Sequence, residues 1–174
     1  RITAAGIPAA DVVVERSADM RLYGQIHEIN VPLPDGPITD AAMPGQLARI
    51  VSSSDAVGAG IFLVPEDRKG QGLLLDFPIM QNVTLPNLPA YSRNGLVTQD
   101  AEHSRASRSR EDLDIRAPDV RVRTGSLSGG NQQKVVLAKW LAMQPKVMIF
   151  DEPTRGIDVG AKSEIYRLMR GLAD

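Results

Sequence analysis

The sequence contains no cysteine, only two histidines and very few aromatic residues. Without cysteine the chain can form neither disulfides nor thiolate metal sites, which agrees with a reducing cytosolic compartment. His27 and His103 are too few for a histidine-rich metal cluster. Aromatic residues make up 4% of the chain, so its core has to be built mostly from aliphatic side chains. These absences exclude a disulfide-stabilised fold, a thiolate metal site and a histidine-rich metal cluster.

Long apolar runs and an excess of charge of one sign are also missing. No run approaches the roughly 18 to 20 residues that a membrane span needs, and the chain does not start with a basic-then-apolar signal peptide. The 20 basic residues nearly balance the 21 acidic ones, which leaves no global field for nucleic acid or an anionic membrane. We therefore expect no nucleic-acid partner, and a membrane role only through another protein. The chain opens at Arg1 rather than Met, as a fragment or a trimmed product would.

What is present suits a soluble globular protein. Hydrophobic residues make up 43% and charged residues 24% of the chain, a composition that allows a buried core. The 174 residues fit one ordinary domain or pieces of two. Residues 1–44 are predicted to form a β-rich segment. It contains an apolar run at 12–14, a half-exposed strand over 20–31 and a proline-rich turn at 32–37.

A seam over residues 45–60 is predicted to separate this segment from residues 61–174. Proline, glycine and serine gather in the seam, and these residues interrupt regular structure. Beyond it the pattern changes, because residues 61–64 and 147–150 are short apolar runs of the buried-strand type.

Helical periodicity lies between and after these strands. A helix is expected over residues 128–143, ended by Pro145, and another from about residue 159, with Asp158 as its cap. Buried strands that alternate with helices predict an α/β layer with parallel strands.

Residues 100–124 are rich in arginine, which invites a nucleic-acid interpretation. Acidic residues interleave with the arginines, however, and no aromatic side chain is available to stack on a base. A solvated helical face is therefore the better interpretation of this stretch.

The strongest motif is the sequence LSGGNQQK at residues 127–134. Ser128, Gly129 and Gly130 stand where a long helix begins. Glycine lets the backbone approach a ligand closely, and a helix N-terminus offers unpaired N–H groups with a partial positive charge, a combination suited to phosphate. Simple capping of the helix by Ser128 explains the same residues equally well when the motif is taken alone.

A second motif, KVMIFDEPT, follows at residues 146–154. An apolar strand that ends in Asp151 and Glu152 places two carboxylates in the crevice where α/β sheets bind ligands. One carboxylate can support Mg²⁺, usually through water, and its neighbour can orient a water that attacks a γ-phosphate. The alternative is that these are two acidic residues in an exposed turn with no functional role. The preceding buried strand and the phosphate-type helix start disfavour it.

Together these motifs resemble an ABC-type ATPase. Residues 128–130 match its signature, 147–152 its Walker B element and 156–158 its D-loop. Together with the upstream VPEDRKGQG, the sequence of these motifs is similar to the second cassette of tandem ribose, xylose and galactose importers over about residues 48–174. The implied fold is α/β, a partial P-loop NTPase-like cassette with the helical signature portion and the Walker B strand, preceded by the short β-rich segment.

The resemblance also implies roles for single residues and partners. Ser128, Gly129, Gly130 and Gln132 would contact the γ-phosphate of an ATP held by a second cassette. Asp151 would support Mg²⁺, Glu152 would be the general base, and Asp158 would cross the dimer interface. Glu66 lies where the family usually has its Q-loop glutamine, which implies contact with the metal and the permease. The cassette would work in the cytoplasm on the inner face of the membrane, with permease subunits and, indirectly, a periplasmic sugar-binding protein.

The phosphate loop of such an ATPase, GxxxxGK[ST], is absent from the sequence. None of the five lysines stands in that frame, and the family's switch histidine would fall beyond Asp174. We therefore expect the chain to carry half of an ATPase site and to be inactive when isolated. The missing strand of the phosphate loop would expose a sheet edge, which predicts a marginal or aggregation-prone fold.

The opening of the chain has a different resemblance. Over about residues 10–40, the sequence ERSADMRLYGQ and the later VPLP look like hydantoinase A/oxoprolinase enzymes, which use ATP to open cyclic amides. This suggests a fused or mis-assembled reading frame, joined between Met43 and Asp55. Two alternatives to an importer ATPase therefore stand: a hydantoinase-type amidohydrolase fragment and an inert fused fragment.

Overall fold

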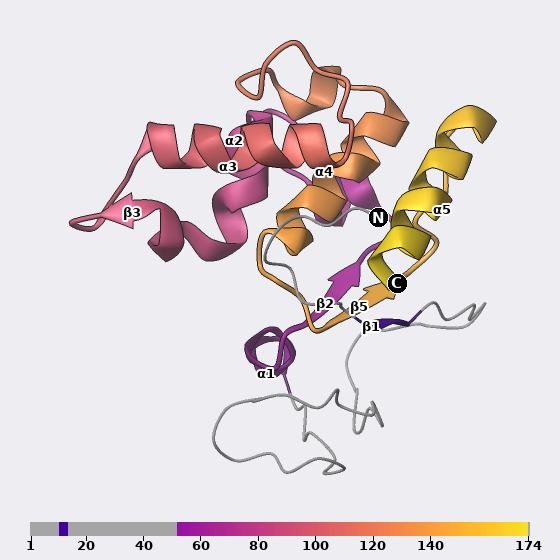
Figure 1. The fold of residues 1–174 in the computed structure, drawn as a ribbon, viewed down its shortest axis with the longest axis horizontal. Coiled ribbons are helices and arrows are strands. Elements are labelled where there is room, and N and C mark those ends of the chain that lie inside the picture. The colour runs from indigo at the N-terminus through magenta and orange to yellow at the C-terminus, as the bar shows by residue number, and fades with distance from the viewer. Residues whose placement is uncertain (1–10, 14–51, 174) are drawn as a thin grey trace.

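The computed structural model describes residues 11–13 and 52–173 of the chain. In this part a small parallel sheet lies beside a larger group of helices (Figure 1). The predictions for the strand over 20–31 and the turn at 32–37, and most of the 1–44 segment, concern residues outside the described ones.

The sheet has three strands, β1 (Asp11–Val13), β2 (Ile61–Val64) and β5 (Val147–Phe150). Strand β5 lies in the middle and pairs in parallel with both of the others. The two buried strands and their parallel arrangement are therefore as the sequence predicts. Residues 12–13 of the predicted apolar run lie in β1, which joins the sheet across more than a hundred residues of sequence.

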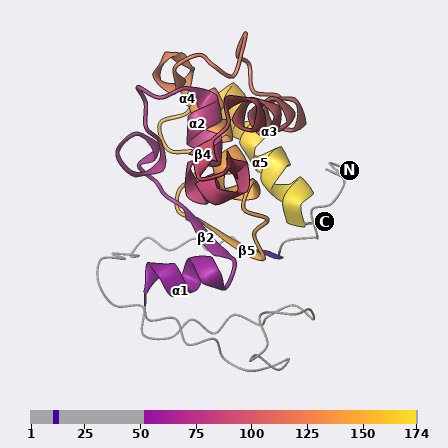
Figure 2. The same cartoon turned by 90° about the vertical axis from the view of Figure 1, so that its left-hand side faces the viewer.

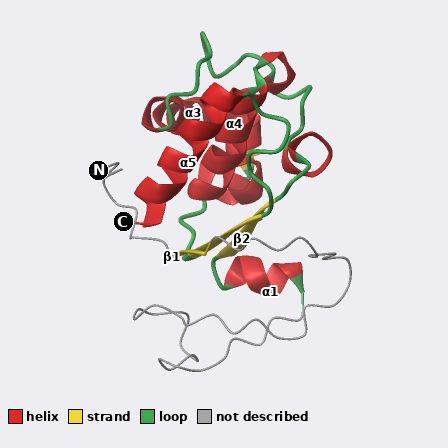
Figure 3. Ribbon diagram, turned by 90° about the vertical axis from the view of Figure 1, so that its right-hand side faces the viewer, coloured by secondary structure: helices red, strands yellow, loops and turns green. Residues whose placement is uncertain are grey.

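The two faces of the sheet are covered unequally, because side chains alternate along a strand. Val64, Met148 and Phe150 point into the main core, which the helices complete. Ile61 and Val147 point to the other face, where the short helix α1 (Ser53–Gly58) packs on them. Figures 2 and 3 show the sheet between α1 and the remaining helices.

Helix α1 corrects the prediction of a turn-rich seam, since residues 53–58 are helical. The Ser52 hydroxyl accepts a hydrogen bond from the Asp55 N–H at 3.2 Å and caps the first turn. Ala56 and Ala59 then pack against the small apolar cluster beneath the sheet. Capping and packing outweigh the turn propensity of the surrounding glycines and serines.

Helix α4 (Gly129–Leu141) is the centre of the helical layer. Residues 132–138 are all buried, and they contact the sheet and α2 (Ile79–Thr84). Helix α4 stops at Leu141, shortly before the predicted end at 143, because the chain turns back through Gln144, whose φ is 53°, before it reaches Pro145. Helix α5 (Val159–Ala173) begins where the sequence predicts.

The first half of the charged stretch at 100–124 forms α3 (Gln99–Asp112), and residues 113–124 that follow are not α-helical. One face is solvated, as expected, but Ala106 and Ser109 on the other face are buried. Glu102 is buried there too and accepts a hydrogen bond from the Thr84 hydroxyl at 2.6 Å. A hairpin of β3 (Ser92–Arg93) and β4 (Leu96–Val97) precedes α3 and turns through an Asn-Gly pair with positive φ.

A fully buried amide, Asn82 on α2, fastens the loop between β2 and α2. Its Oδ1 accepts a hydrogen bond from the Leu74 N–H at 2.8 Å. Its Nδ2 donates to the Leu74 carbonyl at 2.9 Å and to the Thr124 hydroxyl at 3.0 Å. Longer contacts reach the carbonyls of Phe77 and Pro78. One side chain thus bonds the backbone at Leu74 and at 77–78 and the hydroxyl of Thr124.

In the part of the chain that the structure describes, every helix is too short or too polar to cross a membrane.

Candidate functional site

The ends of β2 and β5 bring the predicted acidic residues to one edge of the sheet. Because Val64 pairs with Phe150, both strands end at the same level. The Asp151 N–H donates to the Val64 carbonyl at 3.0 Å and extends the pairing by one residue. Glu66 follows β2 after a single proline, so it leaves the sheet beside Asp151. This is the edge at which α/β sheets bind ligands.

The two carboxylates of the DE pair have different surroundings. Asp151 is half-buried, whereas Glu152 is exposed and has a left-handed backbone, with φ at 41°. A tight turn follows, in which the Arg155 N–H donates to the Glu152 carbonyl at 3.0 Å. An exposed carboxylate beside a half-buried one suits the separate roles that the sequence assigns to them.

Ser128 begins α4 and acts as its cap. Its hydroxyl oxygen accepts hydrogen bonds from the Asn131 N–H at 3.5 Å and from the Asn131 side-chain amide at 3.0 Å. The side chain remains exposed, so capping and ligand contact do not exclude each other. Gly130 is buried against α5. A methyl group at this position would lie 2.6 Å from the Cβ of Ala161. Only a glycine lets the starts of α4 and α5 pack this closely.

Gln132 is placed differently from the other signature residues. It is 4% exposed, and its Nε2 donates to the Leu127 carbonyl at 3.1 Å. Its Oε1 is buried with no hydrogen-bond partner in the described part of the chain. The structure therefore directs Gln132 into the interior, away from the exposed Ser128 hydroxyl.

Asp158 begins α5 as its cap, as predicted. Its Oδ2 accepts a hydrogen bond from the Ala161 N–H at 3.0 Å, and the side chain is exposed. Since α4 and α5 start side by side, Asp158 and Ser128 lie on neighbouring helix N-termini.

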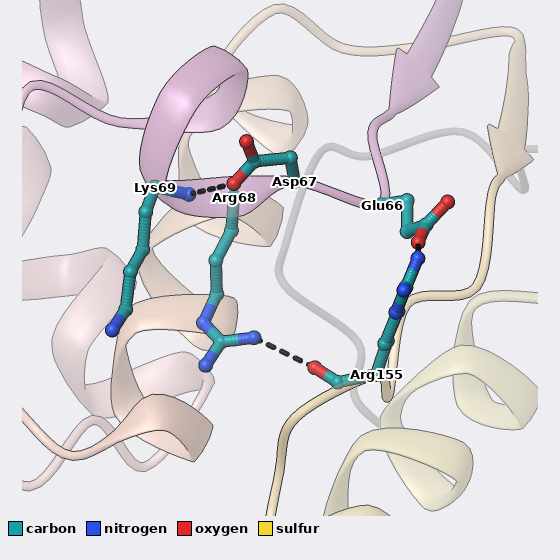
Figure 4. A pocket seen from close by; sticks show the side chains of 5 residues that line it. All are labelled: Glu66, Asp67, Arg68, Lys69 and Arg155. Carbon is teal, nitrogen blue, oxygen red and sulfur yellow. Dashed lines mark hydrogen bonds and ion pairs between the residues drawn. The ribbon is translucent and has the colours of Figure 1, made fainter.

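Glu66 lines a pocket of about 340 Å³ at the edge of the sheet, together with Asp67, Arg68, Lys69 and Arg155. Figure 4 shows the Glu66 carboxylate paired with the guanidinium of Arg155, on the turn after the DE pair. The pocket therefore joins the loops that follow β2 and β5. Sequence reasoning found Glu66 but neither arginine, since nothing in their spacing sets them apart.

Lys134, the last residue of LSGGNQQK, is a buried cation that sequence reasoning also missed. Its Nζ donates to the Asp114 carbonyl at 2.8 Å and pairs with Glu164 of α5 at 3.0 Å. Arg116 pairs with the same Glu164 carboxylate at 3.0 Å. This network fixes α4, α5 and the 114–116 loop to one another.

The hydrogen bond from Lys134 lowers the pKa of Glu164 below its ordinary value of 4.5. Burial opposes this shift, and the charges of Lys134, Arg116 and Arg167 add to it. A group whose pKa falls on folding stabilises the fold above its unfolded-state pKa. That contribution is lost as the pH falls through the folded-state pKa. The network should therefore weaken below about pH 4.5.

Acid unfolding tests this network. We expect the wild-type chain to lose more stability between pH 6 and pH 3 than Glu164→Gln, because the variant has no carboxylate to protonate. Melting temperatures measured across this range give the comparison, with Glu111→Gln on the exposed face of α3 as the control. Parallel pH profiles for the wild type and Glu164→Gln would show that the ion pair contributes nothing.

A metal ion at this edge would have to be bound by few protein ligands. Within residues 52–173, no cluster of three or more histidine, aspartate or glutamate side chains is arranged to hold one. Mg²⁺ keeps several waters and commonly takes one or two carboxylates plus phosphate oxygens. Asp151 alone, half-buried at the strand end, fits that requirement.

Comparison with known proteins matches residues 52–155 to the ABC transporter family. The ribose import ATP-binding protein RbsA of Lactococcus lactis subsp. cremoris is 49% identical over 130 residues, 75% of this chain and 26% of that protein. RbsA 3 of Rubrobacter xylanophilus is 52% identical over 131 residues, with the same two coverages of 75% and 26%. The chain thus spans about a quarter of the length of the curated relatives it matches.

Solved structures give the same fold at lower sequence identity. A dimeric ATP-binding cassette in a post-hydrolysis state, bound to ADP and Pi, aligns with a TM-score of 0.55 at 22% identity, over 72% of this chain and 53% of that one. An inward-facing transporter of the metal-chelate type aligns with a TM-score of 0.53 at 20% identity, over 76% and 49%. The described residues therefore form part of a P-loop NTPase-like cassette.

Proposed function

This chain belongs to the ABC transporter family, and on that premise we propose that it is part of an ATPase that drives the import of a sugar. The observation that carries the proposal is the shared strand edge, where Glu66 and the DE pair emerge together. The relatives named for ribose import, about half identical over three quarters of the chain, support sugar as the transported class.

In this proposal Glu152 is the general base and Asp151 supports Mg²⁺. The metal, when bound, would neutralise phosphate charge. Glu152 is exposed at the strand end and free to take a proton from a water. The backbone N–H of Asp151 extends the pairing of β5 with β2, which fixes the position from which its carboxylate projects. Glu66, on the loop that follows β2, would contact the same site.

Ser128, Gly129 and Gly130 are proposed to face the ATP of a second cassette, with Asp158 beside them. Their support is the pair of adjacent helix N-termini, which offer N–H groups and partial positive charge to phosphate. Gln132 is buried, so in this proposal it supports the Leu127 backbone and would need to rearrange to touch phosphate. From the relatives we propose two partners, the membrane permease and, indirectly, a periplasmic sugar-binding protein. We also propose that the chain works on the cytoplasmic face of the membrane.

A hybrid ATPase tests the proposal. In this hybrid, residues 52–173 of the present chain replace the matching segment of the Lactococcus lactis ribose import ATP-binding protein. We expect the purified hybrid to hydrolyse ATP and to restore ribose uptake to cells that lack the native protein. The relative with this segment deleted is the lower control. A folded hybrid with no more ATPase activity than the deletion would contradict the proposal.

The hydantoinase-like resemblance at residues 10–40 stays a prediction, since only residues 11–13 of that segment are described.

A further inference from the structure

Arg68 is a buried cation in a run of exposed charges. It begins the single π turn Arg68–Gly72 after β2 and is 8% exposed, whereas Asp67 and Lys69 on either side are exposed. None of the ion pairs among residues 52–173 includes it. A buried guanidinium without a carboxylate is costly, so its position calls for a reason beyond stability.

The guanidinium is held by two backbone carbonyls on a distant turn. Nη1 donates to the Arg155 carbonyl at 2.8 Å, and Nη2 donates to the Gly156 carbonyl at 3.2 Å. Figure 4 shows the first of these bonds across the pocket. Both carbonyls belong to the turn that leads from Glu152 to Asp158. A planar guanidinium with fixed donors restricts the orientation of that turn more than a lysine would.

The same guanidinium also contacts the start of α4. A methyl group on Gly129 would lie 2.8 Å from Nη2 of Arg68 and 3.4 Å from the Gly156 carbonyl oxygen. A positive charge beside a helix N-terminus is unfavourable, and the two carbonyls offset it. Nη2 therefore sits between Gly129 and Gly156, with no room for another side chain.

We propose that Arg68 is a positioning residue that locks the 155–156 turn to the start of α4, so that Asp158 and Ser128 keep a fixed spacing. This rests on the proposed function, in which these two residues face the same partner nucleotide. Arg68 acts through the backbone of the two elements, and it links both to the loop that carries Glu66.

The first arm of the test is amide hydrogen exchange in the 174-residue chain, which needs no ATPase activity. In Arg68→Ala we expect exchange to speed up by at least about tenfold at Ile157, Ala161 and Gln132, whose N–H groups bond within the two tethered elements. Amides of α3 should not change. Arg123→Ala is the matched control, because the Arg123 side chain is exposed and, among residues 52–173, forms an ion pair with the exposed Asp76 alone.

The second arm is turnover by the hybrid. Arg68→Ala should lower kcat about 10- to 100-fold while the KM for ATP stays within about threefold, since misplacement by an ångström costs this much without removing a binding contact. Arg68→Lys should fall between, because lysine can reach one carbonyl but not hold both. If Arg68→Ala fails to fold, Arg68→Lys carries both arms.

The outcomes separate the inference from the function. Unchanged exchange and unchanged kcat in the folded variants would overturn the positioning role. Faster exchange throughout the chain, α3 included, would overturn it too, by showing a general structural role. A wild-type hybrid without ATPase activity would refute the proposed function, while the exchange arm would still decide whether Arg68 ties the two elements.

Discussion

Glu152→Gln in the hybrid is expected to bind ATP normally and to hydrolyse it about 10²- to 10⁴-fold more slowly, the range that a general base contributes. Glutamine keeps the size and polarity of the side chain but cannot accept a proton from an attacking water. The bound nucleotide should therefore stay as ATP, and the cassette should be trapped before turnover.

The structure makes this substitution a clean one. Glu152 is exposed, and the ion pairs among residues 52–173 do not include it. Its carbonyl, which accepts from the Arg155 N–H, is retained by any residue. The loss of the carboxylate should hence change chemistry without changing the fold.

The measurement is single-turnover hydrolysis, paired with nucleotide binding by equilibrium dialysis. Glu111→Gln makes the same chemical change on the outer face of α3 and should hydrolyse ATP at the wild-type rate. Unchanged hydrolysis in Glu152→Gln would remove this residue from the catalytic role. Loss of ATP binding would assign it to the binding of nucleotide instead.

Asn82→Ala is expected to destabilise the chain by about 3 to 5 kcal/mol, because each buried polar group left without a partner costs about 1 to 3 kcal/mol. The substitution strips the Leu74 N–H of its acceptor and the Leu74 carbonyl of its donor. The Thr124 hydroxyl loses a contact as well. Asn82 and Thr124 have no exposed surface, whereas Leu74 is 42% exposed, so water can replace the lost bonds only at the Leu74 end of the network.

Urea unfolding followed by circular dichroism measures this change in free energy. Gln81→Ala is the matched control, since it truncates the half-buried amide that precedes Asn82 on the same helix, and we expect a loss below about 1 kcal/mol. Asn82→Asp should be no better than alanine, because a carboxylate would face the Leu74 carbonyl. A loss below about 1 kcal/mol for Asn82→Ala would mean that the network contributes little.

The sequence predicted those parts of the fold whose pattern is local. The strands at 61–64 and 147–150 are unbroken apolar runs, and Asp158 stands directly before a helical stripe, so both were read correctly. Helix α1 was missed because its six residues, SSDAVG, are too few and too mixed to show a clear period. The pairing of β1 with β5 joins segments too distant for any local pattern to relate.

The candidate site was predicted by its motifs but not by its supports. Asp151, Glu152 and Ser128 lie where the spacing placed them, at a strand end and a helix start. Burial within the motifs was invisible, because Gln132 and Lys134 are polar residues that tertiary contacts draw inward. Arg68 lies in a run of charged residues between the exposed Asp67 and Lys69, and only the folded chain distinguishes it from them.

The backbone at Glu152 has a consequence for how such a chain evolves. A φ of 41° suits glycine or asparagine better than glutamate, and holding another residue there costs on the order of 1 kcal/mol. With Glu152 as the proposed general base, selection for stability and selection for activity would favour different residues at this one position. A duplicated copy released from hydrolysis would be expected to drift towards glycine or asparagine here, which would record the loss of activity in the sequence itself.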